Sequence, residues 1–192
     1  MKRVCVFSGS KSGAKESFRS AAHQLGTLIA QRDLELVYGG ASVGLMGIVA
    51  DAVLGAGGRV IGVIPEFLVA KEIAHARLSE LHVVQTMHER KALMAQLADG
   101  FIAIPGGFGT FEEYCEMLTW SQLRIHDLPC GLLNTEGFYD PLLQLFDQAL
   151  EHQFLRAEHR ELVLEHADPG ILLQMLDTFH ARKAQAVASR GG

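Results

Sequence analysis

The chain has few cysteines and no long apolar run. Its 192 residues include only three cysteines, Cys5, Cys115 and Cys130, which are too few and too scattered for a disulfide framework or a zinc site. Buried thiols in a reducing compartment are the simplest interpretation of them. The first apolar run ends at Ser8, too early for the core of a signal peptide, and no later run could span a bilayer. We therefore expect a cytoplasmic protein with no membrane partner.

Excess positive charge and several catalytic motifs are also missing. The formal net charge is −5 and no basic stripe is present, so a nucleic acid polymer is not an expected partner. The nine histidines lack ligand spacing, so no metal site is expected. No Gly-x-Ser-x-Gly elbow supplies a nucleophile for acyl hydrolysis. Leu45 stands where a P-loop needs lysine, which argues against a Walker-type NTPase. Neither long glycine turn reads Gly-x-Gly-x-x-Gly, which argues against a dinucleotide enzyme.

Short β-branched runs alternate with longer amphipathic segments. This alternation is typical of an α/β fold, a doubly wound parallel sheet flanked by helices in a single domain. We assign the domain to residues 1–180 and expect a flexible tail over residues 181–192. The pattern predicts strands over residues 4–7, 34–38, 60–64, 82–85, 101–104, 131–133 and 162–164, and helices over residues 16–30, 89–97 and 141–153, with two more that end near residues 54 and 123.

Three glycine-containing turns, at residues 8–10, 38–44 and 105–113, each follow a predicted strand and precede a helix. Ligands of doubly wound sheets bind at this edge, where the winding reverses. Glycine lets backbone N–H groups approach an anion, and the following helix adds partial positive charge. The turns predict a site for a mononucleotide or sugar phosphate, although tight turns without a ligand have the same composition. Candidate phosphate or ribose contacts in this region are Ser10, Gly39, Gly40, Gly44 and Met46.

Glu112 and Glu113 close the third turn. An acid held beside a bound phosphate is well placed to orient water or to contact a ribose hydroxyl. The same segment also has the pattern of a capping box, with Thr110 as the N-cap and Glu113 reaching back from the third helical position. The two interpretations are compatible, and both remain open.

Arg90 and Lys91 are adjacent cations at a junction between a strand and a helix. Cations at a helix start oppose the helix macrodipole, and a bound anion would explain their presence. The alternative is a solvated surface pair. On physical grounds alone, Glu72 is an ordinary exposed helical acid.

Taken together, these segments resemble the LONELY GUY family, the cytokinin riboside 5'-monophosphate phosphoribohydrolases once mislabelled lysine decarboxylases. The family signature Pro-Gly-Gly-x-Gly-Thr-x-x-Glu is met in full over residues 105–113. The resemblance covers nearly the whole chain. It continues through Tyr38-Gly39-Gly40, Gly44-Leu45-Met46-Gly47, Met87-His88-Glu89-Arg90-Lys91, Thr119-Trp120-Ser121-Gln122-Leu123, Gly131-Leu132-Leu133-Asn134 and Tyr139-Asp140-Pro141-Leu142-Leu143.

The resemblance implies hydrolysis of the N-glycosidic bond of a nucleoside 5'-monophosphate to free base and ribose 5-phosphate, without a metal or organic cofactor. It also implies a Rossmann-like fold and a homodimer whose active sites lie near the subunit interface. By the same resemblance Arg90 and Glu113 are catalytic. The implied substrate contacts are Glu72, Arg90, Lys91, Gly107, Phe108, Gly109, Thr110, Phe111, Glu112, Glu113 and Thr119.

Two positions depart from the family pattern: Arg124 replaces the usual glycine, and Leu128 stands where lysine is common. Both bear on dimer packing and base preference, not on the reaction class. Two other functions remain open, a broader purine and pyrimidine nucleotide 5'-monophosphate nucleosidase and a non-enzymatic nucleotide or cofactor carrier, since related folds carry molybdenum cofactor. Lysine decarboxylation is disfavoured, because pyridoxal phosphate needs a Schiff-base lysine and Lys91 is better explained as an anion contact.

Overall fold

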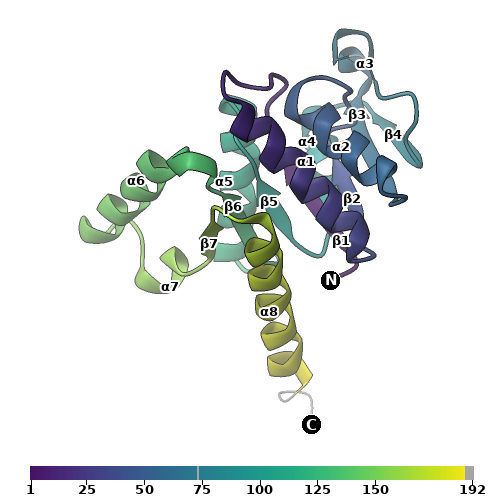
Figure 1. The fold of residues 1–192 in the computed structure, drawn as a ribbon. Coiled ribbons are helices and arrows are strands. Elements are labelled where there is room, and N and C mark those ends of the chain that lie inside the picture. The colour runs from purple at the N-terminus through teal and green to yellow at the C-terminus, as the bar shows by residue number, and fades with distance from the viewer. Residues whose placement is uncertain (73, 189–192) are drawn as a thin grey trace.

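A sheet of seven parallel strands organises the molecule (Figure 1). The computed structural model describes the backbone of residues 1–72 and 74–188. The strands lie in the order β4-β3-β2-β1-β5-β6-β7, so the winding reverses between β1 and β5. This order confirms the predicted Rossmann-like, doubly wound sheet. The strands are β1 (Arg3–Phe7), β2 (Glu35–Tyr38), β3 (Val60–Pro65), β4 (Glu80–Val84), β5 (Phe101–Ala103), β6 (Cys130–Leu133) and β7 (Val163–His166).

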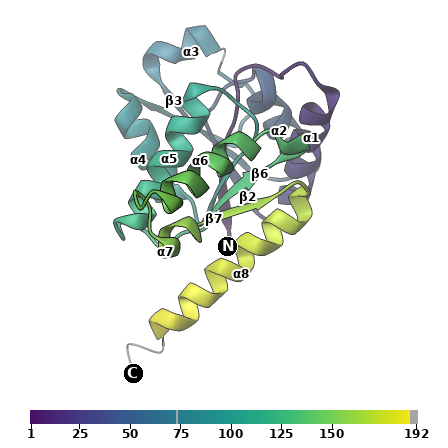
Figure 2. The ribbon, with the colours of Figure 1, turned by 90° about the vertical axis from the view of Figure 1, so that its left-hand side faces the viewer.

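Helices cover both faces of this sheet, as Figures 1 and 2 show. Val4 and Val6 of β1 pack with α1, α2 and α8 on one face, whereas Cys5 and Phe7 pack with α4 and α5 on the other. The inner strands are therefore buried on both sides and need continuous apolar runs. The helices are α1 (Glu16–Gln31), α2 (Gly44–Gly55), α3 (Glu66–Glu72), α4 (Met87–Leu97), α5 (Phe108–Gln122), α6 (Asp140–Glu151), α7 (Ala157–Arg160) and α8 (Pro169–Ala188), with a short 3₁₀ turn η1 (Thr135–Gly137).

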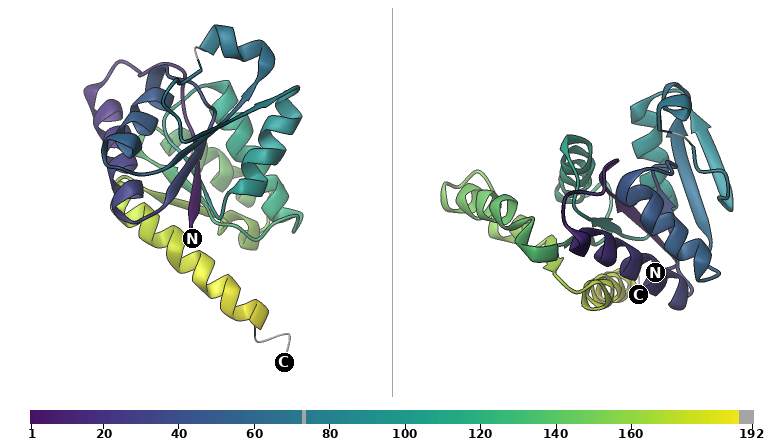
Figure 3. Two further views of the ribbon diagram at one scale, coloured as in Figure 1. Left: turned by 90° about the vertical axis from the view of Figure 1, so that its right-hand side faces the viewer. Right: turned by 45° about the horizontal axis from the view of Figure 1, so that its top comes forward.

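Two parts of the chain extend from this body. The helices α6 and α7 project to one side (Figure 3), and no residue of α6 is fully buried. The helix α8 projects at the end opposite α3 (Figure 2) and continues without a break through residue 180 to Ala188. The domain boundary at residue 180 and the flexible tail stay predictions, because residues 189–192 lie outside the described part of the chain.

All seven predicted strands are present, and their bounds lie within two residues of the prediction. The five predicted helices are present with the same accuracy. The helices α3, α7 and α8 are not among the predicted segments, and α3 and α7 are short. A helix of about two turns or fewer carries too little hydrophobic periodicity to be recognised in one sequence.

The contact between α1 and α2 depends on the absence of a side chain at Gly26. A Cβ there would lie 2.5 Å from the carbonyl oxygen of Val49 and 2.7 Å from the Cβ of Ala52, both on α2. We expect Gly26→Ala to destabilise the protein by about 1–3 kcal/mol, because the two helices must move apart. Chemical denaturation measures this difference.

Gly55, the last residue of α2, supplies a matched control because a Cβ there would meet nothing within 4 Å. Gly55→Ala should leave stability unchanged or raise it by up to about 1 kcal/mol, through helix propensity alone. Equal stabilities for the two variants would show that the approach of α1 to α2 does not require glycine.

Candidate active site

A cavity of about 280 Å³ lies at the carboxyl ends of β1, β2 and β5, where the winding reverses. Ligands of doubly wound sheets bind at this position. Residues from all three predicted glycine turns line it, so segments far apart in the sequence converge on one space. The lining residues are Val6, Phe7, Ser8, Gly9, Ser10, Gly39, Met46, Leu68, Met87, Arg90, Met94, Gly107, Phe108, Gly109, Thr110 and Glu113.

Two of the turns touch through their backbones beside the cavity. The N–H of Gly9 donates to the carbonyl oxygen of Pro105 at 3.2 Å. A Cβ on Gly106 would lie 2.9 Å from the Gly9 nitrogen and would overlap the Thr110 hydroxyl. A side chain at Gly106 would therefore separate the end of β1 from the start of α5, and glycine is required there by packing.

The helix α5 begins earlier than the capping-box interpretation requires. Its N-cap is Gly107, with no side-chain cap hydrogen bond, and its first helical residue is Phe108. The capping box with Thr110 as N-cap is therefore wrong, because Thr110 already lies inside the first turn and Glu113 in the next. The first turn instead presents unpaired N–H groups and the positive end of the helix dipole beside the cavity.

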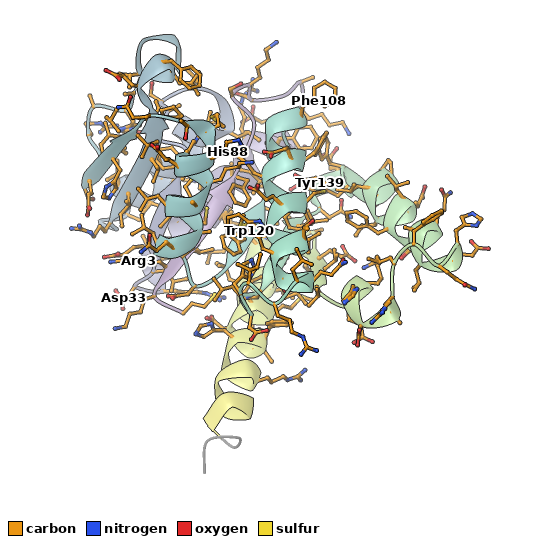
Figure 4. All side chains as sticks on the ribbon, turned by 180° about the vertical axis from the view of Figure 1, so that it is seen from behind. Arg3, Asp33, His88, Phe108, Trp120 and Tyr139 are labelled. Carbon is orange, nitrogen blue, oxygen red and sulfur yellow. The ribbon has the colours of Figure 1, made fainter. Side chains whose placement is uncertain are left out.

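Gly107 and Gly109 leave open space at the start of α5. A Cβ on either residue would meet nothing within 4 Å, so the packing of the fold does not require glycine at these positions. Phe108 lies between them and is 92% exposed; in Figure 4 it projects from the end of α5. The open space suits a ligand that lies directly against the backbone.

Arg90 is buried in the wall of the cavity, which rules out the solvated surface pair. It lies on α4, whose N-cap Thr86 accepts a hydrogen bond from the N–H of Glu89 at 3.1 Å. Only 5% of Arg90 is exposed, and its Nη2 donates to the carbonyl oxygen of Gly39 at 3.3 Å. A Cβ on Gly39 would overlap this nitrogen. Arg90 Nε has no partner within the described part of the chain, so a buried donor remains for a ligand.

Glu113 lines the same cavity and is 8% exposed. Burial chiefly, and then the negative charge of Glu113, raise the pKa of the Cys5 thiol on β1, while the positive charge of Arg90 lowers it. Cys5 therefore stays a protonated thiol below the site. The cavity thus brings together a buried guanidinium, a buried carboxylate and a helix N-terminus.

Ser8 was not singled out as a site residue from the sequence. It follows β1 directly, is 9% exposed and lines the cavity, and its hydroxyl makes no hydrogen bond to any described residue. The signal in the sequence is its place as the first polar residue after a buried strand. Leu68 was also missed, because α3 was not predicted. With Met46, Met87 and Met94 it gives the cavity an apolar wall suited to a heteroaromatic base.

The structure brings most of the predicted site residues to this cavity but leaves others away from it. Ser10, Gly39, Met46, Arg90, Gly107, Phe108, Gly109, Thr110 and Glu113 line it. Gly40 and Gly44 do not, although their positive φ angles of 80° and 60° shape the turn between β2 and α2. The side chain of Glu72 lies outside the described residues.

Four predicted contacts on α4 and α5 do not line the cavity. Lys91 pairs with Glu112 and with Glu116. Phe111 packs against Phe138 and Tyr139. Thr119 is exposed and donates to the carbonyl oxygen of Cys115 at 2.8 Å, about 9 Å along the helix from Glu113. Adjacent helical positions point about 100° apart, which a linear motif does not reveal.

Within the described residues, no group of three His, Cys, Asp or Glu side chains is arranged to hold a metal ion. None of the described helices is both long enough and apolar enough to cross a bilayer.

Comparison with known proteins gives several extensive similarities. A family model described as "possible lysine decarboxylase" matches residues 46–176. The chain is 50% identical over 188 residues to a protein of Oryza sativa subsp. japonica named probable cytokinin riboside 5'-monophosphate phosphoribohydrolase LOGL1, covering 98% of this chain and 84% of that one. It is 47% identical over 178 residues to cytokinin riboside 5'-monophosphate phosphoribohydrolase LOG2 of Arabidopsis thaliana, covering 93% and 84%.

Among solved structures, the molybdenum cofactor carrier protein of Chlamydomonas reinhardtii has a TM-score of 0.71 at 23% identity, covering 94% of this chain and 98% of that one. At this identity the similarity supports the fold alone. The family model and the plant relatives show more: this chain belongs to the LONELY GUY family, whose model still carries the description of a lysine decarboxylase.

Proposed function

We propose that this protein hydrolyses the N-glycosidic bond of cytokinin riboside 5'-monophosphates, and of AMP, to free base and ribose 5-phosphate. Its relatives at 46–50% identity carry the name of this activity. The observation that carries the proposal is the convergence of buried Arg90 and buried Glu113 on a cavity beside the start of α5. The helix N-terminus suits the phosphate of a nucleoside monophosphate. The buried anion suits the positive charge that develops on the ribose, and the buried cation suits the departing base or the ribose oxygens.

The phosphate would lie at the start of α5, against Gly107, Gly109 and Thr110. The N–H groups of the first turn and the helix dipole stabilise a dianion there. The open space at the two glycines allows the phosphate oxygens to approach the backbone. Because the phosphate is remote from the bond that breaks, this binding energy serves to orient the ribose and base.

The reaction adds water across the bond between the ribose C1' and the base nitrogen. As that bond breaks, positive charge develops at the anomeric centre, and the carboxylate of Glu113 stabilises it and positions the attacking water. The water hydroxyl joins C1', and the departing base nitrogen receives a proton. Arg90, held against Gly39, donates hydrogen bonds to the departing base or to ribose oxygens through its rigid fork.

The same proposal includes a homodimer and a cytoplasmic location. Thr119 faces away from its own cavity, so a contact with substrate requires a second copy. Leu123 follows one turn later on the same side of α5 and is 62% exposed, and Ile125 is 63% exposed. A partner that covers these apolar side chains would bring Thr119 toward the partner's site. The free thiols fit a reducing compartment.

The first test is chromatographic detection of free base from a panel of monophosphates and the matching nucleosides. We expect release from N6-substituted adenosine monophosphates and AMP, and none from the nucleosides, which lack the anchoring phosphate. Comparable rates across purine and pyrimidine monophosphates would indicate a broader nucleosidase instead. Tight binding with no base released over hours would indicate a carrier.

Glu113→Gln removes the charge of the carboxylate and keeps its shape. We expect kcat to fall by ~10³-fold, because the developing positive charge loses its stabilising group, while the protein still folds. Steady-state kinetics and circular dichroism check the two parts. Glu151→Gln, at an exposed acid of α6, is the control and should keep wild-type activity. Retained turnover in Glu113→Gln would remove Glu113 from the catalytic role.

Alanine at Gly107 or Gly109 tests the phosphate site separately from the fold. Neither Cβ meets a protein atom within 4 Å, so the melting temperature should change little, while the KM for the monophosphate should rise by ~10-fold or more as the phosphate is displaced. Gly106→Ala is the contrasting variant and should lower the melting temperature, because its Cβ overlaps Thr110. An unchanged KM in both Gly107→Ala and Gly109→Ala would show that the phosphate binds elsewhere.

Leu123→Glu tests the proposed dimer face. A charge at this exposed apolar position should shift the protein from dimer to monomer in size-exclusion chromatography with light scattering, and should lower activity with it, since a charge excludes close apolar packing. Ile171→Glu, on α8 at 46% exposure, is the matched control and should remain dimeric. A dimeric Leu123→Glu protein would move the interface to another surface.

A further inference from the structure

Ser8 is a buried polar residue in the wall of the cavity, and the proposed reaction assigns it no role. It is 9% exposed and follows β1 directly. Its Oγ has no hydrogen-bond partner among the residues that the structure describes. A buried hydroxyl without a partner costs free energy, because it has given up its hydrogen bonds to water. In the wall of a cavity, a ligand that supplies the partner recovers that cost.

The pairing of the strands places Ser8 between two of the glycine turns. The strand β1 lies between β2 and β5, with Val6 opposite Tyr38 and Phe7 opposite Ala103. Ser8 is the next residue, so it has the end of β2 on one side and the end of β5 on the other. The second glycine turn follows β2 and the third follows β5, and both therefore start beside Ser8.

Each of these two turns carries one part of the proposed site. On the β2 side, the carbonyl oxygen of Gly39 accepts a hydrogen bond from Arg90, and a Cβ on Gly39 would overlap the guanidinium. On the β5 side, the turn leads into α5, whose first turn is the proposed phosphate site. The N–H of Gly9 donates to the carbonyl oxygen of Pro105 at 3.2 Å, which holds this turn against the residue after Ser8. Ser8 thus lies between the guanidinium and the phosphate site.

This order along the edge of the sheet matches the order of parts in the substrate. A nucleoside 5'-monophosphate has its ribose between its phosphate and its base. With the phosphate at the start of α5 and the base toward Arg90, the ribose is the part that lies beside Ser8. A ribose hydroxyl both donates and accepts hydrogen bonds, as a serine hydroxyl does. A phosphate dianion only accepts, and the N–H groups of α5 already supply its donors.

We propose that the Ser8 hydroxyl binds one of the two ribose hydroxyls of the substrate and so selects ribonucleotides over the matching deoxyribonucleotides. This contact rests on the proposed hydrolase function. A hydrogen bond to the 2'-hydroxyl, next to the reacting carbon, would strengthen as positive charge develops there. A hydrogen bond to the 3'-hydroxyl would serve to orient the ribose.

The test compares wild type with Ser8→Ala on AMP, 2'-deoxy-AMP and 3'-deoxy-AMP. For AMP, Ser8→Ala should lower kcat/KM for base release by ~10-fold, the effect of one lost hydrogen bond. For the analogue that lacks the contacted hydroxyl, it should change kcat/KM by less than ~2-fold. Each comparison is made on one substrate, so the different intrinsic reactivities of the three cancel. Ser20→Ala, at an exposed serine of α1, is the control and should behave as wild type on all three.

Two further measurements do not depend on turnover. Calorimetry in the Glu113→Gln background, which keeps the substrate intact, should show weaker AMP binding after Ser8→Ala and nearly unchanged binding of the analogue that lacks the contacted hydroxyl. Thermal unfolding without ligand should show the melting temperature of Ser8→Ala unchanged or raised, because the variant removes a buried polar group that has no partner in the described part of the chain.

Equal losses for the three monophosphates would overturn the ribose contact, since a contact to phosphate or to water affects all three alike. Wild-type kcat/KM for AMP in Ser8→Ala would overturn it as well. So would a lowered melting temperature, which would show that the hydroxyl serves the fold. A wild type that releases no base overturns the hydrolase function, and the calorimetric comparison then decides the ribose contact by itself, which fails if AMP does not bind.

Discussion

The approach of two backbones at the point where the winding reverses controls the rest of this structure. The turn after β1 and the turn after β5 touch through the N–H of Gly9 and the carbonyl of Pro105, and Gly106 has no room for a Cβ. Two backbones come this close only where side chains are absent. Because α5 starts immediately afterwards, this contact sets where its N-terminus and Glu113 lie relative to the end of β1. The cavity exists because of that placement.

Arg90 is the second constraint, since a guanidinium is costly to bury unless it is hydrogen-bonded or paired. The protein supplies a carbonyl from Gly39 and places Glu113 in the wall of the same cavity, and Arg90 Nε has no partner among the residues that the structure describes. Ser8 adds a second buried polar group that has no hydrogen-bond partner in the described part of the chain. A cavity with unsatisfied buried donors is complementary to a ligand rich in oxygen. Its methionine-lined side is complementary to a flat base, and together these features match a nucleotide better than either a metal or an apolar ligand.

The sequence was a good guide to the sheet and to which turns form the site. Seven predicted runs became seven strands. The five inner strands are covered on both faces and are mostly apolar, whereas the edge strands β4 and β7 keep exposed positions. It was a poorer guide to individual side chains on α4 and α5. Thr110 has the composition of an N-cap, but the helix begins earlier, at Phe108, because the turn is held by the contact at Gly106. Lys91 follows Arg90 directly in the sequence, yet a step of about 100° turns it toward α5 and away from the cavity.

The sequence by itself determined the fold class, the family and the set of residues from which the site is built, because hydrophobic periodicity and glycine spacing are local properties. Only the tertiary structure decided how these residues divide their roles. Whether a charged side chain faces a cavity, a neighbouring helix or solvent depends on helix rotation and on the elements packed beside it, and both are set by contacts between distant segments. Arg90 and Glu113 line one cavity for that reason, while Lys91 and Thr119, from the same two helices, point elsewhere.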